Sequence, residues 1–120
     1  MSSQSLKIYD PFYCDGRTKV LLRKLGYESV IHEKRDFYAD VKKSKVPLHQ
    51  VLMTNPPYSD DHKEKLFNYV CERYGVPFLL LLPSYVASKG YYRKIVQCYS
   101  DRFQFFYVVP NVAYEYDHPE

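Results

Sequence analysis

Residues 51–58 read Val-Leu-Met-Thr-Asn-Pro-Pro-Tyr, and this stretch sets the interpretation of the whole chain. Its first four residues are apolar or β-branched and predict a strand over residues 51–54. The Asn-Pro-Pro that follows must end this strand, because proline has no amide hydrogen to donate to a sheet. An amphipathic helix is expected soon afterwards, over residues 59–74. A strand that ends abruptly before a helix is the unit from which parallel α/β sheets are built.

The same alternation of strands and helices extends outward on both sides of this stretch. Short strands are expected over residues 6–12 and 29–33, and a helix over residues 17–25 separates them. The nearly continuous apolar run of residues 76–82 predicts a strand that is buried on both faces, as in the middle of a parallel sheet. We therefore expect an α/β fold whose mostly parallel sheet is covered by helices on both faces.

Other segments complete this pattern. A third helix is predicted over residues 89–99 and a last strand over residues 103–109. Residues 34–48 are polar and contain four lysines and a proline, so they are expected to be mainly loop. The predicted capping residues are Asp15 and Gly26 for the helix at 17–25, and Asp61 with Glu64 for the helix at 59–74.

Length and composition limit the classes of protein. The 120 residues predict a single domain over residues 1–120, since domains commonly have roughly 100–200 residues. No apolar run approaches the ~18–20 residues that a membrane span needs, and residues 1–6 lack a signal-peptide core. The three cysteines form no Cys-x-x-Cys pair, so neither a disulfide framework nor a metal site is indicated. We expect a protein of a reducing compartment, either the cytoplasm or the nucleus.

Charge and aromatic content say less about function. The net charge of +3 is too small to indicate nucleic-acid binding by itself. Tyrosine and phenylalanine are abundant, with 14 and 7 residues, while tryptophan is absent. Such richness fits either a core with polar edges or a site where flat rings stack.

The candidate site residues follow the predicted strands, because open α/β sheets bind ligands at the carboxyl ends of their strands. Asp10 comes directly after Tyr9 at the end of the first predicted strand, and Gly16 follows in the turn, where the backbone can approach a ligand closely. After the second strand, Glu33 has the better position to accept hydrogen bonds from ribose hydroxyls, and Asp36 is its competitor. Either acid could equally be a solvated surface charge. We expect His32 to be an ordinary strand-end side chain, because no neighbour in sequence orients it.

The most specific motif is Asn55-Pro56-Pro57-Tyr58. The prolines fix two backbone angles and leave carbonyl groups that no helix or sheet uses. The side-chain oxygen of Asn55 and the backbone oxygen of Pro56 can accept both hydrogens of one –NH2 group, whose lone pair then points away. Tyr58 can stack on the flat group that carries this nitrogen. This arrangement predicts chemistry on an amino nitrogen.

Taken together, these motifs resemble those of the class I S-adenosyl-L-methionine-dependent methyltransferases that methylate amino groups. The resemblance rests on Asp-Pro-Phe-x-x-x-Gly at residues 10–16 and, about forty residues on, Asn-Pro-Pro-Tyr at residues 55–58. It implies a Rossmann-like three-layer sandwich with S-adenosylmethionine as cofactor. Enzymes of this family methylate the N6 of adenine in DNA or RNA, the N2 of guanine in ribosomal RNA, or the glutamine amide of release factors.

The resemblance also implies roles for individual residues. Asp10 matches the acid of the first family motif, and Glu33 matches the acid that holds the ribose. Asp36 is the match for a later acid near the adenine ring. The remaining matches are Pro11, Phe12 and Gly16 in the cofactor loop, and Asn55, Pro56, Pro57 and Tyr58 as the catalytic tetrapeptide.

The sequence departs from the family pattern in ways that affect the expected fold. Tyr13 and Cys14 add bulk to a cofactor loop that is usually rich in glycine. Residues 33–50 are short for a further strand and helix, and family domains are often longer than this chain. The sheet is therefore expected to be reduced, and residues 1–120 are expected to be either a small domain or an incomplete one that a missing segment or a protein partner completes.

Several functions remain open from the sequence alone. We expect a nucleic-acid substrate, RNA ahead of DNA, because the chain is slightly basic and its tyrosines can stack on bases. Protein glutamine is the alternative substrate, since its amide presents the same –NH2 group. A non-catalytic module that binds nucleic acid or a partner protein is the alternative class, with Lys42, Lys43 and Lys45 facing phosphates.

Overall fold

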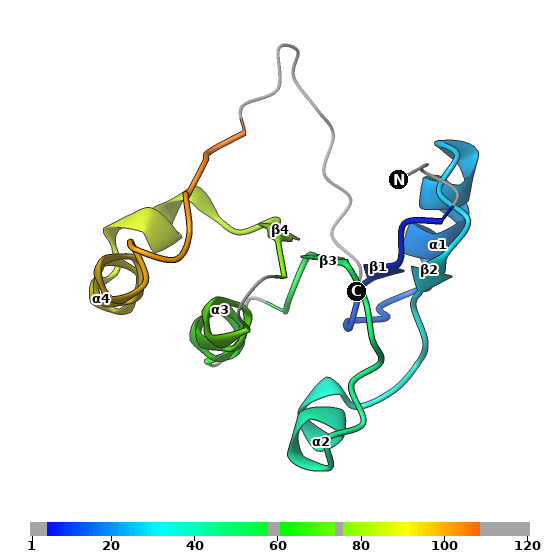
Figure 1. Cartoon of the computed structure of the whole chain (residues 1–120), viewed down its shortest axis with the longest axis horizontal. Coiled ribbons are helices and arrows are strands. Elements are labelled where there is room, and N and C mark those ends of the chain that lie inside the picture. The colour runs from blue at the N-terminus through cyan, green and yellow to red at the C-terminus, as the bar shows by residue number, and fades with distance from the viewer. Residues whose placement is uncertain (1–4, 58–60, 74–75, 109–120) are drawn as a thin grey trace.

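A four-stranded parallel sheet forms the centre of the protein, for which we analysed a computed structural model. The structure describes residues 5–57, 61–73 and 76–108. Within them the strand order is β2-β1-β3-β4, and all three pairings are parallel (Figure 1). The strands are β1 (Ile8–Tyr9), β2 (Val30–Ile31), β3 (Val51–Thr54) and β4 (Phe78–Leu80).

The helices lie between the strands, as the alternating pattern predicts. They are α1 (Arg17–Lys24), α2 (Phe37–Lys42), α3 (His62–Glu72), α4 (Gly90–Cys98) and the short 3-10 helix η1 (Ser84–Ser88). Three of them confirm the predicted helices at 17–25, 59–74 and 89–99. Gly26 ends the first with a left-handed φ of 97°, a conformation that glycine adopts without a steric penalty. Gly16 takes the N-cap position predicted for Asp15, whose Oδ1 instead accepts from the Arg17 amide at 3.2 Å.

The two faces of the sheet are covered by different helices, because side chains alternate along each strand. On one face, Ile8 and Val30 pack with Leu22 of α1. On the other face, Tyr9 and Leu52 pack in a larger cluster with α2, α3 and α4. Figure 1 shows this arrangement, with α1 on one side of the strands, α2 and α3 on the opposite side, and α4 beyond β4. The protein therefore has the predicted Rossmann-like three-layer α/β fold, with a reduced sheet.

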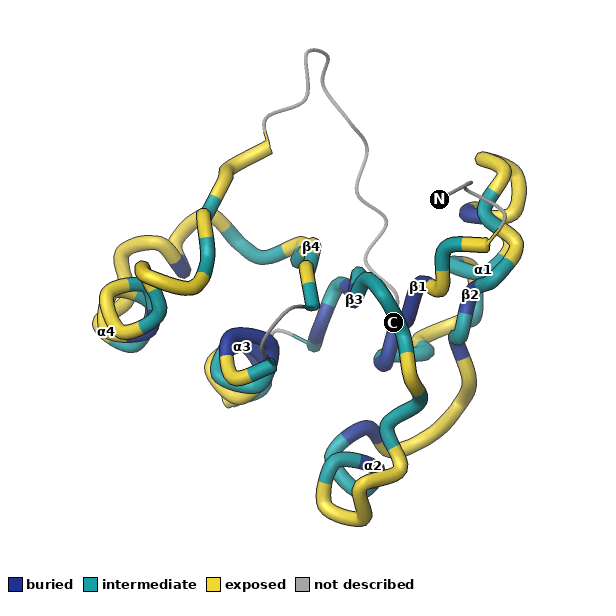
Figure 2. Tube along the Cα trace, in the orientation of Figure 1, coloured by how far each residue is buried: buried dark blue, intermediate teal, exposed yellow. Residues whose placement is uncertain are grey.

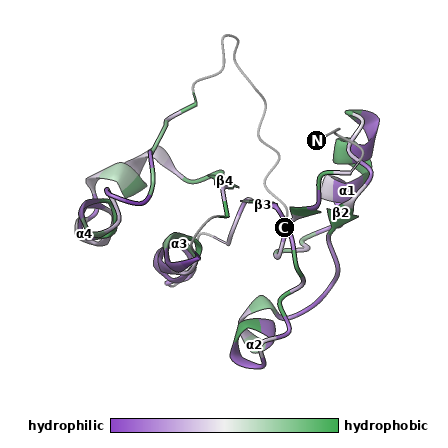
Figure 3. Cartoon of the chain, viewed as in Figure 1, coloured by the Kyte–Doolittle hydropathy of each residue, from purple (hydrophilic) through white to green (hydrophobic). Residues whose placement is uncertain are grey.

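The larger cluster forms the main core and explains much of the aromatic richness. Leu66 of α3 is fully buried, and Figure 2 shows burial concentrated on the central strands and on α3. The Phe67 ring stacks on Tyr92 of α4, with ring centres 5.1 Å apart, and thereby joins two helices. Figure 3 shows the same division by hydropathy, with apolar strands and polar outer helix surfaces. Many of the tyrosine and phenylalanine side chains therefore serve core packing.

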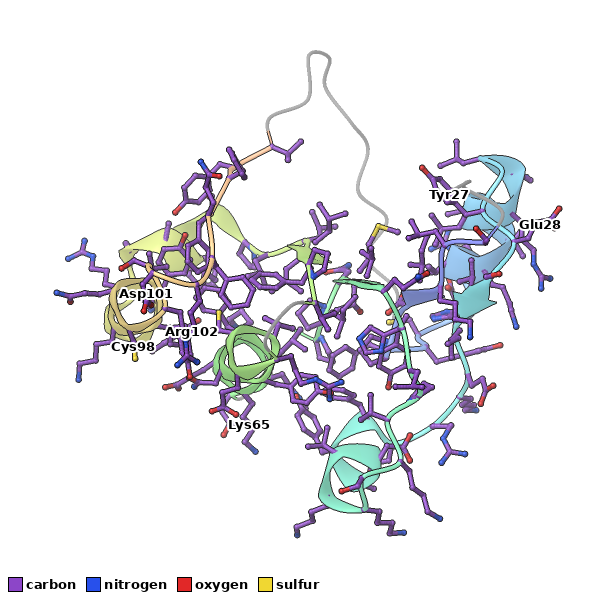
Figure 4. All side chains as sticks on the ribbon, viewed as in Figure 1. Tyr27, Glu28, Lys65, Cys98, Asp101 and Arg102 are labelled. Atoms are coloured by element: carbon purple, nitrogen blue, oxygen red, sulfur yellow. The ribbon has the colours of Figure 1, made fainter. Side chains whose placement is uncertain are left out.

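Side chains occupy the space between the layers from end to end of the molecule (Figure 4). Tyr27 and Glu28, which follow α1, lie at one end in this view, and Cys98, which closes α4, lies at the other. None of the helices in the described ranges is long and apolar enough to cross a membrane.

The prediction of a loop over residues 34–48 was wrong for part of this segment. Residues 37–42 form α2, and Asp36 caps it by accepting a 3.2 Å hydrogen bond from the Ala39 amide at Oδ1. Phe37 anchors the helix in the core with only 3% of its surface exposed. Two turns of helix are too short to show a periodic pattern, so burial and capping decide this element.

Two predictions for the last strands were also wrong. The strand at residues 76–82 was expected to be buried on both faces, but β4 lies at an edge of the described sheet and Leu79 is 51% exposed. Residues 103–108 of the strand expected at 103–109 form no strand, and residue 109 lies outside the described ranges. The rings of Phe103 and Phe105 instead pack against Phe78, with ring centres 5.5 and 6.4 Å away. These half-buried side chains pack against the core without forming a strand.

Candidate functional site

Three strands end close together in a buried polar cluster of Asp10, His32 and Thr54, which we call the Asp10 cluster. Thr54 donates a 2.5 Å hydrogen bond from Oγ1 to Asp10 Oδ1. His32 places its Nδ1 atom 3.2 Å from the Asp10 backbone oxygen and 3.5 Å from Oδ2. Because β1, β2 and β3 are parallel, their carboxyl ends meet at this edge. The contacts of Asp10 with Thr54 and His32 thus connect the ends of the three strands.

Asp10 is an internal residue of this cluster, with only 4% of its surface exposed. Burial raises the pKa of its carboxyl group, and hydrogen bonds from Thr54 and Thr18 oppose that shift. Its Oδ1 atom also accepts from the Phe12 amide at 3.2 Å, which holds the start of the following loop. Asp10 therefore supports the loop predicted to bind cofactor and does not face solvent itself.

The glycine of this loop lies beneath a tyrosine. Gly16 has a left-handed φ of 80°, and a Cβ atom placed there would come within 2.5 Å of Tyr13 Oη. The Tyr13 ring also stacks on His32, with centres 4.9 Å apart and planes 14° from parallel. The backbone surface of Gly16 that the sequence predicts for a ligand is thus in contact with Tyr13.

A cleft of about 280 Å³ opens beside the Asp10 cluster, at the carboxyl ends of β1 and β2. Two predicted cofactor residues, Pro11 and Glu33, line it. The size is just below the usual range of roughly 300–1,000 Å³ for small-molecule sites, and the lining combines apolar and charged side chains as such sites do. The other lining residues are Tyr9, Ile31, Arg35, Phe37, Asp40, Lys45 and Pro47.

Charge in this cleft is organised by an ion pair. Arg35 binds both carboxylate oxygens of Asp40, at 2.9 and 2.7 Å, and this contact lowers the pKa of the Asp40 carboxyl group. Burial, reinforced by the Asp40 charge, raises the pKa of the Tyr9 phenol far above its ordinary value. Tyr9 therefore stays a neutral hydrogen-bond donor, and Glu33 and Lys45 are the lining charges outside the Arg35–Asp40 pair.

Two other predicted cofactor residues serve the fold. Asp36 is exposed, but its carboxylate caps α2. Phe12 is half-buried and packs against Phe37 and Tyr38, with ring centres 5.5 and 6.1 Å away. Neither lines the cleft, whereas Pro11 and Glu33 do.

The predicted catalytic segment follows β3 directly and sits beside the Asp10 cluster. Asn55 is the next residue after Thr54 and is half-buried, with its Oδ1 atom below the surface. Pro56 is buried, Pro57 is half-buried, and Tyr58 lies outside the described residues. The structure therefore places Asn55 at the expected sheet edge, with its amide oxygen turned inward.

The sequence interpretation missed the residues that α2 and the segment just before it bring to the cleft. Arg35, Phe37 and Asp40 lie in the segment that was expected to be loop, so no periodicity suggested that they face one another. A local signal is Asp36 itself, because aspartate is one of the residues preferred at a helix N-cap. The orientation of His32 by Asp10 was also missed, because it joins residues 22 positions apart.

Comparisons with known proteins add no family assignment. No protein-family model matches the chain, and no match was found among curated proteins or among solved structures.

Proposed function

We propose that the protein is an S-adenosylmethionine-dependent methyltransferase that transfers a methyl group to an exocyclic amino nitrogen of a base in RNA or DNA. One observation carries the proposal: Asn55-Pro56-Pro57 follows β3 at the sheet edge that also holds the Asp10 cluster and the Glu33 cleft. Methyl transfer requires that the cofactor and the accepting amino group bind side by side. The Asn55 segment offers a place for the amino group, and the cleft with Glu33 at the same sheet edge offers one for the ribose of the cofactor.

The residues present fit such a cofactor once Tyr13 leaves Gly16. Glu33 at the cleft offers a carboxylate to ribose hydroxyls, and Pro11 contributes an apolar wall. Gly16 has no Cβ atom, so its backbone can approach a ligand closely. When bound, S-adenosylmethionine supplies an electrophilic methyl group on sulfur.

The role of the Asn-Pro-Pro segment is to orient the accepting nitrogen. Asn55 Oδ1 and the Pro56 backbone oxygen accept the two amino hydrogens, which directs the nitrogen lone pair toward the methyl group. The Asn55 side chain must turn outward for this contact, because its Oδ1 atom is buried in the structure. No strong base is needed, since the nitrogen becomes acidic only after it has gained the methyl group.

Nucleic acid is favoured as the substrate by the charge around the cleft. Lys42, Lys43 and Lys45 are exposed at the end of α2, and Lys45 also lines the cleft. Exposed lysines beside the proposed cofactor cleft are suited to contact a phosphate backbone. A glutamine amide would use the same Asn55 contacts but would gain nothing from these lysines.

Methyl transfer from labelled S-adenosylmethionine to RNA, DNA and a glutamine peptide tests the proposal. We expect transfer to RNA or DNA, and Asn55→Ala should reduce turnover by about 100-fold or more while changing cofactor affinity by less than about twofold. Asn68→Ala on α3 is the matched control and should resemble the wild type. Near-normal turnover of Asn55→Ala would remove the catalytic assignment, and transfer only to the peptide would replace the substrate.

A non-catalytic nucleic-acid module is the second candidate. The observation that favours it is the covered state of the site, with Tyr13 on Gly16 and the Asn55 oxygen buried. This reading predicts RNA binding without S-adenosylmethionine and with a steep dependence on salt. Calorimetry with the cofactor alone separates the two candidates.

A further inference from the structure

The imidazole of His32 is held in one orientation and sealed from solvent. Its residue is 4% exposed, and its Nδ1 atom lies 3.2 Å from the Asp10 backbone oxygen. A carbonyl oxygen can only accept, so Nδ1 must carry the proton in this contact when the ring is neutral. Its Nε2 atom is then left with a lone pair, ready to accept a hydrogen bond.

That Nε2 atom has no hydrogen-bond partner among the described residues, although it is fully buried. Most buried polar atoms in folded proteins are paired, and an unpaired one needs a specific explanation. The neighbouring contacts leave the other side of the ring fully engaged with Asp10. A fixed, buried acceptor without a partner among the described residues is suited to a ligand that arrives later.

Tyr13 is the side chain that covers this ring. It stacks on the imidazole at 4.9 Å, and the same tyrosine lies against the Gly16 backbone. One side chain thus covers both the His32 ring and the glycine proposed to receive cofactor. Tyr13 comes from the irregular loop between β1 and α1, where a change of side-chain rotamer disturbs no helix or strand.

We propose that Tyr13 is a displaceable cover and that His32 is a binding residue beneath it, whose Nε2 atom accepts a hydrogen bond from a hydroxyl or amino group of the cofactor's nucleoside. This inference rests on the proposed function and assigns that site a contact beyond Glu33. The ligand takes the place of the Tyr13 ring against Gly16 and His32. Asp10 keeps the imidazole in the orientation that presents Nε2.

A tryptophan at position 13 reports on the cover directly, since the chain has no other tryptophan. We expect Tyr13→Trp emission to change on titration with S-adenosylhomocysteine, which binds without reacting. Calorimetry should show Tyr13→Ala binding this nucleoside roughly three- to tenfold more tightly, because no ring stack has to be broken, and Tyr13→Phe binding like the wild type. Unchanged emission on binding, or weaker binding by Tyr13→Ala, would contradict the proposal that the ligand displaces Tyr13.

One histidine variant and one NMR measurement on the wild type test the Nε2 contact. His32→Asn retains a donor near the position of Nδ1 and removes Nε2, so we expect affinity to fall roughly three- to tenfold without loss of folding. In the wild type, the nitrogen NMR signal of His32 Nε2 should shift on binding, whatever the variants do. An unmoved signal in a saturated complex would overturn this contact while leaving the proposed function intact. If neither the wild type nor Tyr13→Ala binds S-adenosylhomocysteine, both the proposed function and this inference fail.

Discussion

Thr54, the last residue of β3, donates a hydrogen bond to the buried carboxyl group of Asp10, the first residue after β1. This one contact fixes the Asn55 segment beside the loop that starts at Asp10. The two residues are 44 positions apart in the chain, so the contact depends on the parallel sheet. The geometry of the proposed site therefore rests on a structural hydrogen bond between strand ends.

Removing the Thr54 hydroxyl should destabilise the protein. Thr54→Val keeps the shape of the side chain but leaves Asp10 without its shortest hydrogen bond, in a site that is almost closed to water. We expect the free energy of unfolding in urea to fall by about 1–3 kcal/mol. Thr54→Ser retains the hydroxyl and should lose less. Equal stability of Thr54→Val and the wild type would show that the hydrogen bond does not hold the strand ends.

A side chain at position 16 should conflict with both the backbone and Tyr13. Gly16→Ala places an L-residue at a φ of 80° and a Cβ atom within 2.5 Å of Tyr13 Oη. We expect a loss of about 1–2 kcal/mol from the left-handed backbone alone. The double variant with Tyr13→Ala should regain the steric part of the loss, so that the two substitutions are not additive. Strictly additive losses in chemical denaturation would mean that Tyr13 does not press on this glycine.

The stability of the protein should depend on His49 below about neutral pH. Burial lowers the pKa of this imidazole below its ordinary value of 6.5, and its ring packs on Tyr9. As the pH falls below 6.5, the unfolded chain therefore takes up a proton more readily than the folded protein, and stability is lost. His49→Asn keeps a donor toward the Pro47 carbonyl but does not titrate. Urea titrations from about pH 5 to 7.5 should show a flatter dependence for this variant; the same slope in both proteins would contradict the assignment.

The sequence was sufficient to predict the elements whose pattern is local. The helix at residues 17–24 is followed by a glycine stop at Gly26, and the strand at residues 51–54 is ended by prolines. The parallel arrangement then places Asp10 and Asn55 at one edge by topology alone. These features carry most of the fold and the position of the candidate site.

The remaining features depend on contacts between distant residues. Whether β4 is central or at an edge depends on what pairs with it, and the apolar run of residues 76–82 reads alike in both cases. Asp36 caps a helix only because α2 forms after it. Asp10 is a buried acceptor because the sheet brings Thr54 beside it. The position of Tyr13 over His32 is a matter of side-chain rotamer, which a sequence pattern does not determine.

The central claim is that the cleft beside the Asp10 cluster holds S-adenosylmethionine, with Glu33 as a binding residue. Calorimetric titration of the cofactor into the wild type, Glu33→Ala and Glu28→Ala tests it most directly. Both glutamates are exposed, but only Glu33 lines the cleft. We predict one site in the wild type, affinity about tenfold or more weaker in Glu33→Ala because hydrogen bonds to a carboxylate are lost, and wild-type affinity in Glu28→Ala. Absence of cofactor binding to the wild type, or equal affinity in all three proteins, would contradict the account.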